Sequence, residues 1–144
     1  MASTEDIVKI LGGSGVLKQR IKTMSELELL VERGLPYRAL ETVMETFRLG
    51  LGEVQKVLLV PPRTLARRKE TSRMKAIESD RLIRLARVGA RAVQVLGTGE
   101  KAATWLHRAN KALGDRPPLD LLRTDLGAKQ VEDVLGRVEH GVIG

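Results

Sequence analysis

The stretch LGEVQKVLLVPPRTLARRKE, Leu51 to Glu70, decides the fold. Apolar residues recur at helical spacing over about 52–59, and Pro61-Pro62 then ends that helix and begins another, because proline fits a first turn but not a helix interior. The run VLLV alone would also fit a buried strand, but no partner strand lies nearby in the sequence, so we interpret it as helix. Two short helices joined by a turn of a few residues have the dimensions of a helix-turn-helix.

The second of these helices, about 62–70, has one large apolar side chain, Leu65, and a cationic remainder. The N-terminal residues of such a helix contact base edges in the major groove, where an arginine can bond O6 and N7 of one guanine. Cations beyond the helix end are better placed for phosphates. The residues predicted to bind DNA are Arg63, Thr64, Arg67, Arg68, Lys69 and Arg73. The alternative is a solvated helix end, where basic groups suit the macrodipole.

The composition predicts helices throughout the rest of the chain. Leu, Ala, Glu, Arg and Lys dominate, β-branched runs are short, and Trp105, Tyr37 and Phe47 are the only aromatic residues among 144. Such a chain favours helices and an aliphatic core. We therefore expect an all-α fold, with a helix-turn-helix domain followed by a small helical domain.

Capping and stop signals outline the other helices. Thr23 with Glu26 fits a capping box, and threonines 98 and 124 are good N-caps. The expected helices cover about 23–34, 36–50, 78–96, a segment from 98, a short turn from 117, and 124–141. The glycine run at 12–15 lacks the Gly-Lys-Ser/Thr of a phosphate loop and predicts a flexible turn. The expected units are 1–22, 23–76 (helix-turn-helix) and 77–144.

The net charge of +7 is unevenly distributed along the chain. Residues 1–60 carry eight basic and eight acidic side chains, whereas residues 61–87 carry nine basic and three acidic ones. Residues 115–144 carry four basic and six acidic side chains, a net charge of −2. This asymmetry indicates an anionic partner for the middle of the chain and a different partner for its end.

The sequence shows no signature of catalysis, of a cofactor or of a metal site. Cysteine is absent, and His107 and His140 are the only histidines, without metal-ligand spacing. No carboxylate lies in a recognisable nucleophile or phosphate motif. No apolar run approaches the length of a membrane span, and the N-terminus is too polar for a signal peptide. We expect a cytoplasmic protein that is not an enzyme.

Four blocks in series resemble one protein family. The stretch quoted above, within residues 36–75, is similar to the Xre-type helix-turn-helix. ESDRLIRLAR (78–87), KAATWLHRANKALGDRPPLDLL (101–122) and TDLGAKQVEDVLGRVEHGVIG (124–144) then resemble the antitoxins of the Xre/MbcA/ParS toxin-binding family. The resemblance covers about 36–144, and Ala109 departs from it where the family commonly has proline.

The resemblance implies an antitoxin of a type II toxin-antitoxin system. Its partner would be a RES-domain toxin that degrades NAD or attaches ADP-ribose to proteins, and operator DNA would be bound to autorepress the operon. The antitoxin is expected to form a homodimer within a larger toxin-antitoxin complex. In this family the extreme C-terminus enters the toxin's active-site cleft. That role would fall on Arg137, Glu139, His140, Gly141, Val142, Ile143 and Gly144.

The residues themselves leave other interpretations open. A net acidic segment with an apolar end could fill a basic cleft that handles pyrophosphate, but terminal disorder would give the same pattern. Trp105 on an apolar helix is read mainly as core. Two alternatives for the function remain. One is a stand-alone transcription regulator, and the other is an antitoxin that sequesters its toxin without binding DNA.

Overall fold

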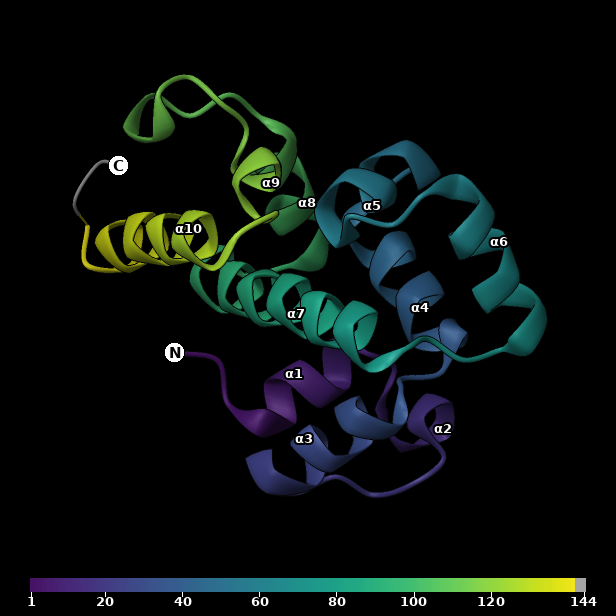
Figure 1. Ribbon diagram of the computed structural model, residues 1–144. Helices are drawn as coiled ribbons and strands as arrows, with labels where there is room; N and C mark the ends of the chain where they lie inside the picture. The colour runs from purple at the N-terminus through teal and green to yellow at the C-terminus, as the bar shows by residue number, and fades with distance from the viewer. Residues whose placement is uncertain (142–144) are drawn as a thin grey trace.

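The computed structural model describes residues 1–141, and within that part of the chain every named element is helical (Figure 1). The all-α prediction is confirmed. The helices are α1 (Thr4–Ile10), α2 (Gly13–Leu17), α3 (Met24–Arg33), α4 (Tyr37–Phe47), α5 (Leu51–Leu58), α6 (Pro62–Thr71), α7 (Ala76–Leu96), α8 (Gly99–His107), the 3₁₀ turn η1 (Lys111–Leu113), α9 (Pro118–Leu121) and α10 (Asp125–Glu139).

The capping signals of the sequence lie where helices begin. The N–H of Glu26 donates to Thr23 Oγ1 at 3.1 Å, and the N–H of Thr23 donates to Glu26 Oε1 at 3.0 Å, which closes the expected capping box of α3. Thr98 and Thr124 accept from backbone N–H groups in the same way. These bonds satisfy donors that a helix start leaves without a partner.

Helix α7, with 21 residues, runs through the middle of the molecule. Helices α1 and α3 lie on one side of it and α8 to α10 on the other (Figure 1). Helices α4, α5 and α6 gather near its first turns (Figure 1). Gly89 lets α4 approach closely, because a Cβ at this position would lie 2.4 Å from the ring of Phe47. One helix thus contacts both halves of the chain.

The N-terminal segment packs into the core of the molecule. The expected glycine turn exists at Gly12 and Gly13, both with positive φ, but it leads directly into the single helical turn of α2. Ile7, Leu11 and Leu17 are fully buried in the same apolar cluster as the rest of the chain. Burial of these side chains contributes about 1.5–3 kcal/mol each to holding the segment on the core.

No helix within residues 1–141 combines the length and apolarity that crossing a membrane requires.

Candidate functional site

Helices α5 and α6 meet at a tight turn with the geometry of a helix-turn-helix. Helix α5 ends at Leu58, and Leu59 adopts a left-handed conformation with φ 55°. Pro61 is the N-cap of α6 and Pro62 lies in its first turn. The proline pair therefore stops one helix and starts the next, as the sequence predicts.

Helix α6 is anchored by one apolar side chain and exposes its cations. Leu65 is buried, while Arg63, Arg67 and Lys69 are exposed and Thr64 is half-buried. Arg63 and Arg67 are four residues apart and so share one helix face, which points away from Leu65. That outward face has the donors that base edges and phosphates accept.

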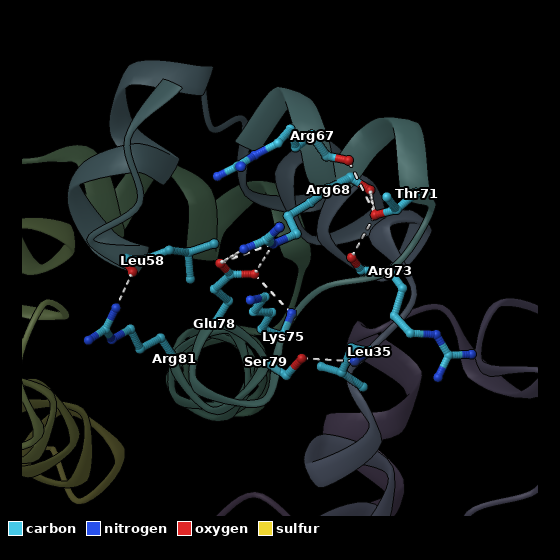
Figure 2. A network of polar contacts seen from close by, with 10 residues as sticks. All are labelled: Leu35, Leu58, Arg67, Arg68, Thr71, Arg73, Lys75, Glu78, Ser79 and Arg81. Atoms are coloured by element: carbon cyan, nitrogen blue, oxygen red, sulfur yellow. Dashed lines mark hydrogen bonds and ion pairs between the residues drawn. The ribbon is translucent and has the colours of Figure 1, made fainter. Parts of the chain in front are cut away.

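Arg68 differs from its neighbours because its guanidinium is bound within the protein (Figure 2). Its Nε donates to Glu78 Oε1 at 2.8 Å and its Nη2 to Glu78 Oε2 at 3.1 Å. The side chains of Arg68 and Glu78 are only 14% and 7% exposed. The sequence placed Arg68 among the DNA-contacting residues, but here it fastens α6 to α7.

The Arg68–Glu78 pair is strongly biased toward its ionised form. Burial alone would raise the pKa of Glu78, but hydrogen bonds from Arg68 and from the N–H of Lys75 outweigh it and hold this pKa below the ordinary range. The hydrogen bond to Glu78 in turn raises the pKa of the Arg68 guanidinium. Such charge-assisted, bidentate bonds also fix geometry.

The first turns of α7 also hold the two other parts of the helix-turn-helix unit (Figure 2). Ser79 Oγ accepts the N–H of Leu35 at 2.8 Å, just before α4. Arg81 Nη1 donates to the carbonyl of Leu58 at 2.9 Å, at the end of α5. Glu78, Ser79 and Arg81 together therefore set how α6 is presented.

Arg73 lies beyond α6 and is exposed. Its one polar side-chain contact within residues 1–141 is from Nη1 to the carbonyl of Arg33 at 3.4 Å, and the side chain extends away from α7 in Figure 2. The backbone of this exit is fixed, since the N–H of Met74 donates to Leu35 O at 2.9 Å. Arg73 thus keeps the exposed position that the sequence predicts.

The C-terminal candidates lie at the end of α10. Arg137, His140 and Gly141 are exposed, and Gly141 has φ 78°. Glu139 is bound to α7 instead: Arg91 donates to its two oxygens at 2.7 and 3.0 Å. These bonds lower the pKa of Glu139 and raise that of Arg91. Val142, Ile143 and Gly144 lie outside the described residues.

Two further ion pairs join α10 to α7. Arg84 Nε lies 2.9 Å from Asp125 Oδ1, and Arg87 Nη2 lies 3.0 Å from Glu132 Oε1. With the Arg91–Glu139 pair they bind three of the acidic side chains of the C-terminal segment. Half of the six acidic side chains of residues 115–144 are therefore paired with arginines of α7.

Beside the end of α10 lies a groove of about 540 Å³. Arg137 lines it together with Trp105, Arg108, Asn110 and Lys111. The partly buried Trp105 packs against the core, as the sequence predicts, and also reaches this groove. The exposed surface near the C-terminus is thus basic and aromatic.

Two family models match this chain in succession. Residues 26–87 match a model described as the antitoxin Xre-like helix-turn-helix domain, and residues 91–141 match the antitoxin Xre/MbcA/ParS C-terminal toxin-binding domain. The protein named antitoxin Xre of Photorhabdus laumondii is 31% identical over 119 residues, which is 81% of this chain and 80% of that protein. This chain belongs to the Xre/MbcA/ParS antitoxin family.

Other members of the Xre antitoxin family give shorter matches. The antitoxin Xre of Yersinia enterocolitica is 41% identical over 92 residues, 62% of each chain. The antitoxin Xre of Pseudomonas putida is 35% identical over 92 residues, 63% of this chain and 58% of its own. The matched segments thus span less than two thirds of these two relatives. The two family models meet inside α7, and the boundary expected from the sequence, between residues 76 and 77, lies at the start of this helix.

Sequence reasoning missed the partners of the arginines. Arg68 lies three residues after Leu65, so the two side chains share one face of α6. This spacing already indicated that Arg68 faces the protein interior. Asp125, Glu132 and Glu139 recur every seven residues, which places them on one face of α10. These spacings were visible in the sequence, but the helix that they contact was not.

Proposed function

We propose that this protein is the antitoxin of a type II toxin-antitoxin pair that binds operator DNA through α6 and a RES-domain toxin through its C-terminal end. The observation that carries the proposal is the different placement of the arginines of α6. Arg63 and Arg67 face solvent, while Arg68 fixes the helix on α7. A cationic face in a set orientation on a helix-turn-helix is what reading a DNA groove needs.

On the DNA side, Arg63, Thr64 and Arg67 are assigned to base edges and nearby phosphates, and Lys69 and Arg73 to phosphates. Arg68 becomes a positioning residue that acts through α6. Operators read by a helix-turn-helix protein are commonly two-fold symmetric, which suits a homodimer within the toxin-antitoxin complex and autorepression of the operon.

On the toxin side, the C-terminal segment is proposed to occlude the active site of a toxin that degrades NAD or transfers ADP-ribose. Arg137, His140 and Gly141 are exposed at the end of α10, and Val142 to Gly144 would continue from there. Since Glu139 is held by Arg91, its role is to fix the direction of this end. Occlusion would then depend on shape and on the apolar tail, not on net negative charge.

The proposed role is binding and not catalysis. His107 joins helices, since its Nε2 lies 2.9 Å from the carbonyl of Phe47 and its Nδ1 lies 3.2 Å from Glu53 Oε2. No group of three or more His, Asp or Glu side chains within residues 1–141 is arranged to hold a metal ion.

The test is growth rescue with the neighbouring open reading frame. Expression of that gene should arrest growth and lower cellular NAD or add ADP-ribose to proteins, and co-expression of this chain should restore growth. Deleting Val142 to Gly144 should weaken rescue, because the tail enters the cleft, while binding to the upstream DNA persists. A neighbour without toxicity, with DNA binding intact, would favour a stand-alone regulator; equal loss of rescue and DNA binding would contradict the tail assignment.

A further inference from the structure

A hollow of about 790 Å³ opens beside the exit of α6, between the helix-turn-helix domain and the N-terminal segment. Its walls come from α2, the end of α3, the start of α4 and the end of α6, and its floor includes Leu17, Leu30 and Tyr37. The N-terminal segment therefore forms a surface together with α6.

The rim of this hollow is strongly cationic. It carries five basic side chains and one acidic side chain, Glu41. The five, called here the cationic rim, are Lys18, Arg33, Arg38, Lys69 and Arg73. Like charges gathered around one hollow repel each other, and an anionic partner relieves that repulsion.

Most of these cations are available to a partner. Lys18, Arg33, Lys69 and Arg73 are exposed and form no ion pair with any residue in 1–141. Arg38 forms two long, exposed contacts, at 3.9 Å to Glu41 and 3.5 Å to Glu45. Exposed pairs of this kind contribute at most about 1 kcal/mol and are easily exchanged.

The cationic rim is fixed relative to α6. The N–H of Tyr37 donates to Ser72 O at 3.0 Å, and the N–H of Met74 donates to Leu35 O at 2.9 Å. Gly34 permits this contact, since it has φ 98° and a Cβ there would lie 2.0 Å from the carbonyl oxygen of Met74. The start of α4 therefore moves together with the exit of α6.

The length of α6 relates the cationic rim to DNA. Six residues separate Arg63 from Lys69, which is about 9 Å along a helix. The major groove is about 12 Å wide, so a helix with its first turn on the bases has its last turn near the phosphates that border the groove. The rim begins at that last turn.

We propose that the cationic rim binds the phosphate backbone of the DNA that α6 contacts, so that Lys18, Arg33 and Arg38 extend the footprint beyond α6. This inference rests on the proposed DNA binding. DNA is favoured over the toxin as the occupant because the rim is continuous with α6 and none of it lies in residues 91–141, which match the toxin-binding domain. Phosphate contacts add affinity without sequence preference.

The test is a fluorescence-anisotropy titration of the full chain with two duplexes, the DNA upstream of its gene and a scrambled duplex of equal composition, at several salt concentrations. The rim variant is Lys18→Gln with Arg33→Gln, which removes both charges but keeps polar, unbranched side chains. The matched control is Lys9→Gln with Lys22→Gln, two exposed cations that do not line the hollow but give the same change in charge. Thermal melts of both variants verify the fold.

The rim variant should lose about tenfold in affinity for both duplexes alike, since two exposed charge contacts disappear. Its slope of log K against log salt should fall by about 1.8, because each phosphate contact contributes about 0.9. Behaviour equal to that of the control, or weakened toxin binding with unchanged DNA binding, would overturn the inference. If Arg63→Ala with Arg67→Ala also left DNA binding intact, the proposed function itself would fail.

Discussion

Helices α6 and α10 are both joined to α7, but by different contacts. Helix α6 buries one large side chain, Leu65, and is fastened by the nearly buried Arg68–Glu78 pair. Helix α10 buries Ala128, Val131, Val134 and Leu135. It also forms three ion pairs with α7 that are more exposed to solvent than the Arg68–Glu78 pair. The difference teaches that polar contacts determine the orientation of α6, whereas apolar packing determines that of α10.

The largest loss of stability is expected when Glu78, the partner of Arg68, is replaced. Replacing Glu78 by Ala should lower the free energy of unfolding by about 4 kcal/mol, because Arg68 is left as a buried charge without a partner. Urea denaturation measures this loss. The matched control is Glu70→Ala, which removes an exposed carboxylate from α6 itself and should cost less than about 0.5 kcal/mol. Equal losses in the two variants would show that the pair does not hold α6.

The apolar side of the comparison is tested at Leu135. Leu135→Ala should lower the free energy of unfolding by about 3 kcal/mol, since a fully buried side chain is truncated. Leu126→Ala, on the same helix with Leu126 76% exposed, is the matched control and should change it little. A small effect at Leu135 in the same urea titration would mean that α10 is not held by its apolar face.

Each ion pair of α10 should contribute less to the free energy of unfolding than the Arg68–Glu78 pair of α6. Arg87→Ala should lower the free energy of unfolding by less than about 1 kcal/mol, because Arg87 and Glu132 are 36% and 23% exposed and water screens them. Lys129→Ala serves as the control for loss of a cation. A loss as large as that of Glu78→Ala would contradict the proposed difference between the helices.

The smallest expected effect is the pH dependence of the stability that the Arg68–Glu78 pair contributes. The pKa of Glu78 is lowered in the folded protein, so its contribution to stability is present above the ordinary glutamate pKa of about 4.3 and is lost as the pH falls through the lowered value. The stability gap between the wild type and Glu78→Gln should therefore narrow as the pH falls from 7 to 3. Urea midpoints measured across that range check it, and a constant gap would refute the assignment.

Local signals in the sequence predicted most of the helices. Threonine caps at 23, 98 and 124 and the prolines at 61 and 62 act within a few residues, so their structural effect can be read directly. In the N-terminal segment, Ile7 and Leu11 give an apolar face, but their spacing does not show which helices cover it. Tertiary packing supplies that information.

The candidate site was predictable only in part, for the same reason. Helical spacing separates the outward Arg63 and Arg67 from the inward Leu65, but the partner of Arg68 lies ten residues away across a turn. The cationic rim draws on four elements between Lys18 and Arg73, so only the folded chain brings its charges together. Residues 1–60 have a net charge of zero, so the charge distribution along the sequence shows no sign of the cationic rim.

The affinity of the Arg63→Ala, Arg67→Ala variant for the DNA upstream of its gene tests the central claim most directly. Two arginines that contact the groove should contribute at least about 1 kcal/mol each, so the variant should lose at least about thirtyfold in affinity. It should also lose its preference over a scrambled duplex, while its thermal stability and growth rescue persist. Lys101→Ala with Lys129→Ala makes the same change in charge on the C-terminal half and should bind like the wild type. Wild-type affinity and preference in the α6 variant would contradict the account.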